Sequence, residues 1–453
     1  MTPIQFLLFI WVQEEVDPPF SDDPPSFKKH VIADMSNGAY FVLPVDLNED
    51  GNMDILGSPS GHLRWFQNDG AGNFTAHPVD SGSNFYSFAV ADIDGDMDLD
   101  IVSGTGTTIL LHQNDGDENF ETQTIHDHSG IILGNIRSVV FADIDGDMDL
   151  DVVSSFLFGG TVQWHENYGA GVFTKEGGGF NLNPIYDNLN SPYSVSSADF
   201  DGDGDNDVVT PSTDGRVYWH ENAGEFGFLC TKVIFAVEDS RAWSVVTADV
   251  DEDTHPDIVL TSRGDDSIRW FQNDGFGNFT NHLIFDMADG ASTAAIGDLD
   301  NDNDLDVLSS SISDFTVRWY ENNGEEKFKT HTLFALDFDT NPDSIATADL
   351  DNDGDLDVIA ATSGDIHWFE NSTITLTEEP PAFPEATTIY PNPTTRVLHI
   401  SYATATTTTY ELIDITGKLL SVVHKTGQEH TIDVSSLSKG NYLLKATTGS
   451  ETT

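Results

Sequence analysis

The chain has 453 residues, enough for two or three domains, and it carries 18 Lys and Arg residues against 77 Asp and Glu residues. A formal net charge of −59 repels nucleic acid and anionic membranes, so neither is an expected partner. A hydrophobic content of 38% with 11% aromatic residues is nevertheless sufficient for a core. The acidic residues must therefore be concentrated and neutralised locally, and multivalent cations are the obvious counter-charge.

The N-terminal segment opens with an apolar run over residues 1–12, too short to span a bilayer but long enough for the core of a signal peptide. No Lys or Arg precedes this run. We therefore interpret residues 1–20 as a truncated signal peptide, and we expect no membrane span elsewhere. The single cysteine, Cys230, excludes an internal disulfide, and we expect it to be buried as a small apolar side chain.

An internal repeat organises residues 27–371. Each copy starts with a ladder of alternating Asp residues, and the seven ladders begin at Asp46, Asp92, Asp143, Asp199, Asp249, Asp298 and Asp349. After each ladder come a short apolar strand, an alternating strand that ends in Asn, as in Leu63–Asn68, and a last strand after a Gly-rich turn. Four short strands per period of about fifty residues form one propeller blade, so we predict an all-β, seven-bladed β-propeller.

The two ends of the repeat region complement each other. The seventh copy stops at Asn371 without its last strand, whereas an orphan copy of that strand, Phe27–Ile32, precedes the first ladder. A strand from the opposite terminus would remove the free edges of an open array. We therefore predict that Phe27–Ile32 completes the seventh blade in a velcro closure.

The composition changes after the repeats. Residues 372–385 are rich in Thr, Glu and Pro and are interpreted as a linker. Residues 386–453 are Thr-rich, with predicted strands near Val397–Tyr402, Thr409–Ile415, Lys418–His424 and Tyr442–Thr447. We predict a small, β-sandwich-like C-terminal domain.

The ladders have the spacing of a cation-binding loop. In Asp199–Asp207, the side chains at positions one, three, five and nine can converge on one ion, with a backbone carbonyl from position seven. An oxygen-only ligand set favours Ca²⁺ over zinc, and crowded carboxylates suit calcium's large flexible shell better than octahedral magnesium. We predict up to seven Ca²⁺ ions; the alternative is exposed acid that only increases solubility.

The same register gives the predicted metal ligands in every copy. They are Asp46, Asn48, Asp50 and Asp54; Asp92, Asp94, Asp96 and Asp100; Asp143, Asp145, Asp147 and Asp151; Asp199, Asp201, Asp203 and Asp207; Asp249, Asp251, Asp253 and Asp257; Asp298, Asp300, Asp302 and Asp306; and Asp349, Asp351, Asp353 and Asp357.

Position six requires a sharp turn that favours Gly. Gly51, Gly204 and Gly354 meet this requirement, whereas the other four copies carry Met97, Met148, Thr254 and Asn303. The fifth copy also has His255 at position seven. We expect that copy to bind calcium most weakly.

A second candidate site lies before the ladders, where the innermost strand of each blade begins. The residues six positions before the ladders are Tyr40, Tyr86, Arg137, Tyr193, Trp243, Ser292 and Asp343. If they point into the mouth of the central channel, the five residues Tyr40, Tyr86, Arg137, Tyr193 and Trp243 are candidates for ligand binding by stacking. The alternative is that these rings only fill the channel or pack between blades. The recurrent Trp of the third strand, as in Trp65 and Trp219, is instead expected in the core.

The ladder, followed by Ile or Val and then Trp-x-x-Asn, resembles the FG-GAP/VCBS repeat family, which includes integrin-α-like and lectin-like propellers. The resemblance covers roughly residues 27–371. It implies a seven-bladed propeller with calcium in loops on one face and ligands on the opposite face or between blades.

The C-terminal segment resembles the type A sorting domain of the type IX secretion system. The residues that carry this likeness are Tyr390–Thr394, Tyr410–Leu420 and Ile432–Leu444. The resemblance implies export by the type IX secretion machinery and a secreted or outer cell-surface location. Such domains end in a further strand, which this segment lacks.

The leading functional hypothesis is a secreted or cell-surface, calcium-binding propeller that recognises glycan or protein ligands without catalysis. A polysaccharide lyase or glycosidase on a propeller scaffold is the first alternative, and a structural scaffold of a surface assembly is the second. No nucleophile elbow, zinc motif or phosphate loop stands out, and so many acids serve the repeat that no catalytic pair can be singled out.

Overall fold

The computed structural model describes residues 4–12, 25–34, 39–59, 61–82, 85–127, 135–173, 183–238, 240–324, 327–336, 340–363, 365–371, 388–390, 397–414, 418–434 and 440–449. It divides into two compact units. One unit comprises Phe20–Thr373, and the other comprises Met1–Pro19 together with Ile374–Thr453.

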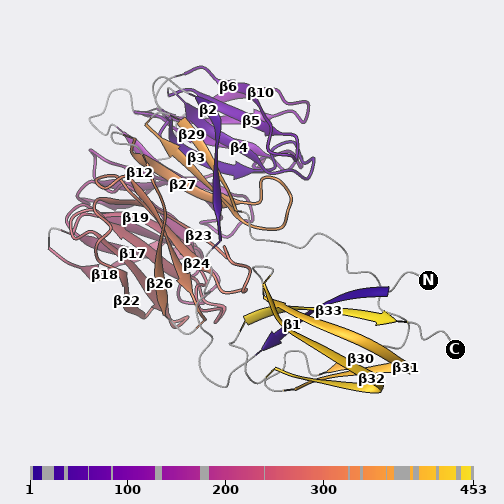
Figure 1. Ribbon diagram of the computed structural model, residues 1–453. Coiled ribbons are helices and arrows are strands. Elements are labelled where there is room, and N and C mark those ends of the chain that lie inside the picture. The colour runs from indigo at the N-terminus through magenta and orange to yellow at the C-terminus, as the bar shows by residue number, and fades with distance from the viewer. Residues whose placement is uncertain are drawn as a thin grey trace. The chain divides into compact units, whose positions relative to one another are not determined.

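The larger unit contains seven antiparallel sheets of four strands (Figure 1). The first three sheets are β3 (Ala39–Val45), β4 (Asp54–Pro59), β5 (Leu63–Asn68) and β6 (Phe74–Asp80); β7 (Ser87–Ala91), β8 (Asp100–Gly104), β9 (Thr108–Asn114) and β10 (Phe120–Asp127); and β11 (Ile136–Ala142), β12 (Asp151–Phe156), β13 (Thr161–His165) and β14 (Asn183–Asp187). The next three are β15 (Ser196–Ala198), β16 (Asp207–Ser212), β17 (Arg216–Asn222) and β18 (Phe228–Ala236); β19 (Ala242–Ala248), β20 (Asp257–Ser262), β21 (Ser267–Asn273) and β22 (Phe279–Phe285); and β23 (Ala291–Gly297), β24 (Asp306–Ser311), β25 (Thr316–Asn322) and β26 (Phe328–Ala335). A short 3₁₀ helix, η1 (Gly224–Phe226), lies between β17 and β18.

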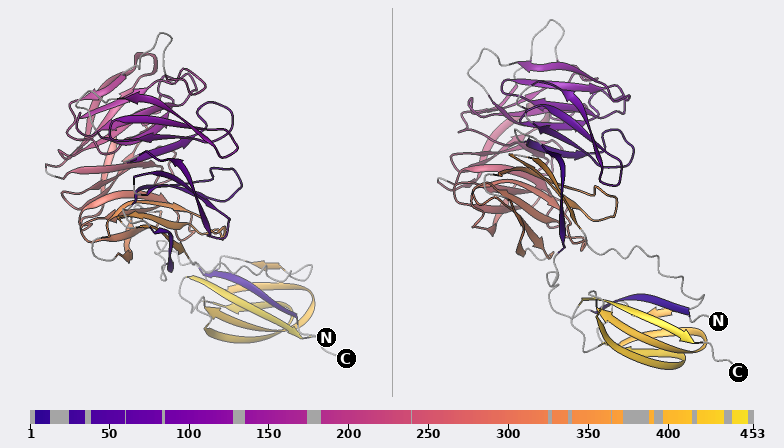
Figure 2. Two further views of the ribbon diagram at one scale, coloured as in Figure 1. Left: turned by 90° about the horizontal axis from the view of Figure 1, so that it is seen from above. Right: turned by 45° about the horizontal axis from the view of Figure 1, so that its top comes forward.

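The seventh sheet combines the two ends of the repeat region. It contains β27 (Pro342–Ala348), β28 (Asp357–Thr362), β29 (Asp365–Asn371) and β2 (Phe27–Asp34). Strand β2 pairs antiparallel with β29, from Phe27 opposite Asn371 to Asp34 opposite Asp365. In Figure 2, β2 is the indigo strand of the larger unit, beside the orange strands. The closure strand predicted from the sequence is therefore present.

The first strands of the sheets form the inside of the ring. Each contacts the first strand of the next sheet, and β27 contacts β3, so the series closes on itself. The second strand of every sheet is buried along its whole length, which explains the short apolar runs after the ladders. The outermost strands alternate between exposed and partly buried residues, as in β22. The fold is a β-propeller, as predicted.

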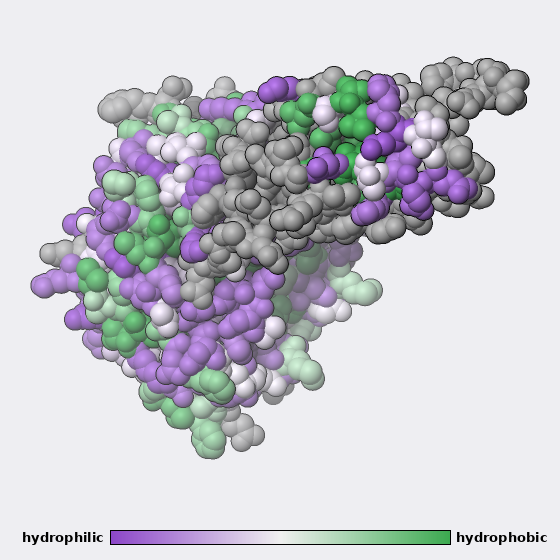
Figure 3. Space-filling view, turned by 60° about the horizontal axis from the view of Figure 1, so that its bottom comes forward, coloured by the Kyte–Doolittle hydropathy of each residue, from purple (hydrophilic) through white to green (hydrophobic). Residues whose placement is uncertain are grey.

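Large aromatic side chains pack between the sheets. Trp65, Trp219, Trp270, Trp319 and Trp368 are buried, as expected for the recurrent Trp. Polar side chains cover most of the described surface seen in Figure 3, with apolar residues in small groups, in keeping with the acidic composition.

One prediction about the propeller is wrong. Cys230 is exposed, because it lies on the outermost strand β18, and its Sγ lies 3.1 Å from Oε2 of Glu221.

The smaller unit contains one sheet in the order β1 (Ile4–Val12), β33 (Gly440–Gly449), β31 (Val397–Asp414) and β30 (Thr388–Tyr390), with β32 (Leu419–Asp433) paired to β31. Two of the strands predicted from the sequence, near 397–402 and 409–415, are parts of the single strand β31. Residues 372–387, which include the predicted linker, and 391–396, which include most of the Tyr390–Thr394 motif, lie outside the described residues.

Part of the predicted signal peptide, Ile4–Val12, forms the strand β1. β1 pairs antiparallel with β33 from Ile4 opposite Thr448 to Val12 opposite Gly440. Cleavage of residues 1–20, like the missing last strand of the C-terminal domain, stays a prediction. Among the described residues there is no helix of the length and hydrophobicity needed to cross a bilayer.

Candidate functional site

Each Asp ladder is the loop that joins the first and second strands of a blade. In the second blade, Asp92 follows the last residue of β7 and Asp100 is the first residue of β8. The remaining six ladders begin in the same way, directly after the inner strand. All seven loops therefore lie at the same end of the inner strands.

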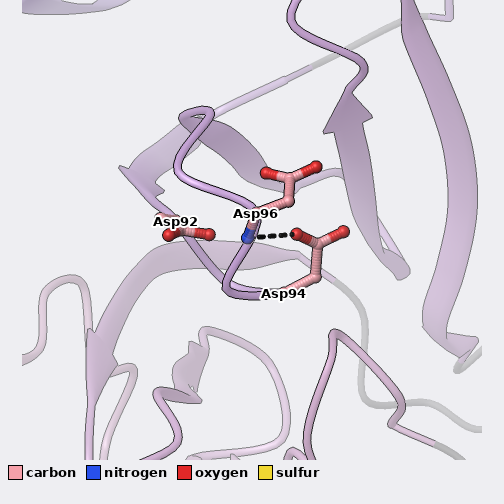
Figure 4. A group of neighbouring side chains, drawn as sticks. All are labelled: Asp92, Asp94 and Asp96. Atoms are coloured by element: carbon pink, nitrogen blue, oxygen red, sulfur yellow. Dashed lines mark hydrogen bonds between the residues drawn. The ribbon is translucent and has the colours of Figure 1, made fainter.

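The carboxylates at positions one, three and five converge. In Asp92, Asp94 and Asp96 (Figure 4), one oxygen of each carboxylate lies within 4.8 Å of an oxygen of the others. The amide N–H of Asp96 donates to Oδ1 of Asp94 over 3.3 Å, which holds the loop in a tight turn. Equivalent groups occur at Asp143, Asp145 and Asp147; Asp199, Asp201 and Asp203; and Asp298, Asp300 and Asp302, whereas the group in the fifth loop is Asp249, Asp251 and Asp257. Several clusters of acidic residues can therefore hold a metal ion.

The Asp at position nine has a structural role that the sequence did not reveal. Asp207 is fully buried, and its two carboxylate oxygens accept hydrogen bonds from the amide N–H groups of Phe200 (3.2 Å) and Asn222 (2.7 Å). Burial raises the pKa of Asp207 to about 7. The same two amide contacts recur at the other six position-nine residues, Asp54, Asp100, Asp151, Asp257, Asp306 and Asp357. This Asp fastens the ladder loop to the third strand, in addition to its predicted role as a ligand.

Position three provides the observation that tests the fit of a cation. Oδ1 of Asp201, Asp300 and Asp351 is buried without a hydrogen-bond partner. Burial and the neighbouring charges of Asp302 and Glu321 raise the pKa of Asp300 to about 7, because ionising clustered carboxylates is costly without a counter-charge. An oxygen-coordinated cation satisfies these oxygens and offsets the repulsion. The residues present therefore fit calcium.

Position six is left-handed in all seven loops. Gly51, Gly204 and Gly354 have φ of 89°, 96° and 94°, and Met97 and Met148 adopt 79° and 75°. Thr254 and Asn303 are also positive, at 77° and 74°. The turn is thus independent of Gly, and a non-Gly residue costs about 1 kcal/mol there. Position four is left-handed in every loop as well, with φ between 56° at Glu49 and 79° at Gly95.

The fifth loop differs from the others, as its sequence suggested. Oδ1 of Asp253 lies 3.0 Å from Nδ1 of His255, and the fifth cluster is formed by Asp249, Asp251 and Asp257 rather than by positions one, three and five. Nε2 of Gln272 donates to Oδ2 of Asp251 over 2.6 Å, a contact that Gln113 also makes with Asp94 in the second loop over 2.9 Å.

In six blades, the Asn at or just after the end of the third strand links neighbouring blades. Nδ2 of Asn222 donates to the carbonyl of Ile144 in the preceding blade over 2.7 Å, and Nδ2 of Asn68 donates to Leu350 of the seventh blade over 2.7 Å. Comparable bonds are made by Asn167, Asn273, Asn322 and Asn371. The repetition of this Asn was visible in the sequence, but its partner in another blade was not.

At the opposite end of the inner strands, the predicted ligand-binding residues line one pocket of about 160 Å³. A continuous row of ring and guanidinium contacts along its wall is formed by Tyr40, Tyr86, Arg137, Tyr193 and Trp243. The ring centroids of Tyr40 and Tyr86 are 5.7 Å apart, and those of Tyr193 and Trp243 are 3.4 Å apart. The guanidinium of Arg137 lies between the two pairs, 4.6 Å from the Tyr86 centroid and 5.3 Å from the Tyr193 centroid.

Two charged residues complete this pocket. The guanidinium of Arg263 lies 3.3 Å from the Trp243 centroid, and its Nη2 donates to Oγ of Ser292 over 2.6 Å. Arg263 also lines the pocket opposite Asp343, whose pKa burial raises to about 6 although the charge of Arg263 lowers it. Trp243 is therefore covered by Tyr193 and Arg263.

Arg263 was not predicted as a site residue. It lies six residues after the Asp at position nine, where the other copies have Ser60, Gly106, Leu157, Thr213, Ile312 and Ser363. The signal in the sequence that could have identified Arg263 is that this position is basic in one copy alone.

Comparisons with known proteins agree with this architecture. A family model described as an FG-GAP-like repeat matches residues 46–103, 92–154, 199–260, 249–309 and 310–360, and one described as a secretion system C-terminal sorting domain matches residues 388–453. No curated protein matches the chain.

Two solved structures share the fold at low sequence identity. BBS1N in complex with ARL6DN, soaked with lead, has a TM-score of 0.54 at 12% identity, covering 78% of this chain and 99% of that chain. The mercury-soaked form has a TM-score of 0.52 at 12% identity, with the same coverage of 78% and 99%. An Agrocybe aegerita lectin that recognises non-reducing terminal N-acetylglucosamine has a TM-score of 0.49 at 20% identity, covering 66% of this chain and 81% of that chain.

The repeat matches extend over more than half of the chain, and the sorting domain follows them. The chain therefore belongs to the FG-GAP-like repeat family, and its C-terminal sorting domain marks it for type IX secretion and attachment at the cell surface.

Proposed function

We propose that this secreted propeller is a calcium-stabilised recognition module that binds a glycan or protein ligand at the channel pocket. The observation that carries the proposal is the single pocket wall in which Tyr40, Tyr86, Arg137, Tyr193 and Trp243, from five different blades, stack on one another.

Calcium has a structural role in this proposal. The ion is held by the carboxylates at positions one, three and five of the ladders, with position nine connecting the loop to the blade. Because the ladders lie at the opposite end of the inner strands from the pocket, calcium supports the ring without contacting the ligand. An exported chain with a single cysteine gains from such metal sites the stability that disulfides provide elsewhere.

The composition of the pocket favours binding over catalysis. Asp343 is the one acidic residue among the described residues that line it, whereas a glycosidase needs two carboxylates on either side of the scissile bond. Trp243 has neighbours 3.3 Å and 3.4 Å from its ring centroid, so its role is to position Arg263 and Tyr193 rather than to receive a sugar on its face.

A glycan array probed with and without chelator tests this function. We expect binding by the calcium-loaded chain that is lost in Tyr193→Ala and Trp243→Ala, because each substitution interrupts the stack. Binding that is unchanged in both variants contradicts the pocket assignment. Turnover of a polysaccharide by the purified chain contradicts the non-enzymatic assignment and favours a lyase or glycosidase.

A further inference from the structure

The channel pocket contains two guanidinium groups that are only partly satisfied. Nε of Arg137 and Nε of Arg263 are both buried and have no hydrogen-bond partner. A buried donor without an acceptor is costly, and more so on a charged group. Both residues line the same pocket, so the two guanidinium groups belong to one site.

The charge of the pocket contrasts with that of the chain. Two arginines and one aspartate line it, in a protein with a net charge of −59. Burial lowers the pKa of Arg263 to about 10, so this guanidinium remains charged at neutral pH. The pocket is therefore a local positive site on an acidic protein, and an anion is the group that its guanidiniums can bind.

Apart from Phe41 and Trp243, the remaining side chains that line the pocket carry hydroxyl groups. Ser138, Ser244 and Thr293 lie around the pocket with the tyrosines, and no aliphatic side chain is found among its described lining residues. Hydroxyls both donate and accept hydrogen bonds, which matches the hydroxyls of a sugar. An aliphatic peptide side chain would find no apolar surface there beyond the aromatic rings.

From these observations we infer that the channel pocket binds the carboxylate of an acidic sugar, with the carboxylate held between Arg137 and Arg263 and the sugar hydroxyls facing the serine, threonine and tyrosine hydroxyls. The inference rests on the proposed recognition function and names its ligand class. The stacked rings act as positioning residues, because Tyr86 and Tyr193 flank Arg137, and Trp243 supports Arg263.

Calorimetry on the full chain at saturating calcium tests the inference with three probes. They are methyl glucuronide, its neutral counterpart methyl glucoside, and acetyl-dialanine, which has a carboxylate but no sugar. We expect methyl glucuronide to bind at least about tenfold more tightly than either of the other two, as for hydrogen bonds to a charged group.

Variants then assign the binding to the two arginines. Arg137→Ala and Arg263→Ala are each expected to weaken methyl glucuronide binding about tenfold or more, and Arg137→Lys to give an intermediate loss, because it keeps the charge but not the planar fork. Lys28→Ala is the matched control, since it removes an exposed positive charge from the outermost strand of the seventh blade. If Arg263→Ala unfolds the propeller, Asp343→Asn provides the second test, because it removes the opposing charge and should tighten binding.

Equal binding of methyl glucoside, or binding unchanged in both arginine variants, overturns the inference. Acetyl-dialanine that binds as tightly as methyl glucuronide assigns the pocket to a peptide carboxylate, which also overturns it. A third outcome separates the inference from the proposed function. If neutral glycans bind on the array, and this binding is lost in Tyr193→Ala but retained in Arg137→Ala, the recognition function is supported and the acidic-sugar ligand is contradicted.

Discussion

The two ends of the inner strands differ in how strictly they follow the repeat. At one end, every blade carries an Asp loop with the same left-handed turn and the same buried Asp at position nine. At the other end, the equivalent position changes from Tyr to Arg, Trp, Ser and Asp around the ring. A feature present in all seven blades serves the architecture, whereas the end where the blades differ can form a site of low symmetry for one ligand.

Removal of calcium should produce the largest change in stability, and it tests whether the Asp loops serve the architecture. We expect chelator to lower the melting temperature by roughly 10 °C or more, because each saturated site adds about 2–3 kcal/mol to the folded state. Differential scanning calorimetry with calcium, magnesium and chelator measures the shift. A melting curve that is identical in calcium and chelator contradicts structural calcium.

Two aspartates of the fourth loop separate the metal role from the hydrogen-bonding role. Asp207→Ala should destabilise the propeller by about 3 kcal/mol even without calcium, because the amide groups of Phe200 and Asn222 lose their acceptor. Asp201→Ala removes a carboxylate whose buried Oδ1 has no hydrogen-bond partner, so it should destabilise the propeller more strongly in calcium than in chelator.

Urea unfolding of both variants, with and without chelator, distinguishes these outcomes. Two variants that lose the same stability under both conditions would show that positions three and nine do not differ in role.

The pocket should respond to pH. Burial raises the pKa of Asp343 to about 6 although the neighbouring charge of Arg263 lowers it, and the pKa of about 10 for Arg263 keeps that guanidinium charged through this range. As the pH falls through about 6, Asp343 becomes neutral and no longer repels an anion, while a sugar carboxylate remains ionised. Methyl glucuronide binding should therefore tighten roughly threefold to tenfold between about pH 7.5 and about pH 5.

Asp343→Asn is the control for this pH response. It should bind tightly at both pH values, since it imitates the neutral acid, and a pH response that persists in it would have to come from another group.

The smallest expected effect concerns the loop turns. Met148 has a φ of 75° and is 90% exposed, so Met148→Gly should stabilise the propeller by about 1 kcal/mol through relief of backbone strain. Gly204→Met is the reciprocal change, because Gly204 has a φ of 96° and no atom lies within 4 Å of the position that a Cβ would take. It should destabilise by a similar amount in chemical denaturation. Equal stability of both variants and the parent would show that the turn stores no strain.

The sequence by itself determined the repeat, the seven blades and the closing strand, because these features depend on local pattern. An Asp ladder, an apolar strand and a Trp-x-x-Asn strand recur with a period that one blade occupies. The absence of a last strand after Asn371 and its presence at Phe27 required no knowledge of distances. The aromatic residues at the start of the inner strands were found in the same way, from their position in the repeat.

Only the tertiary structure decided which polar atoms of these residues have hydrogen-bond partners. Asp207 and Asp201 look alike in the ladder, but the first accepts two amide hydrogen bonds and the second retains an unpaired buried oxygen. Arg263 joins the pocket from a hairpin loop, and Asn68 bonds to a carbonyl 282 residues away. These contacts depend on how the blades close around the ring, and residue spacing within one repeat does not contain that geometry.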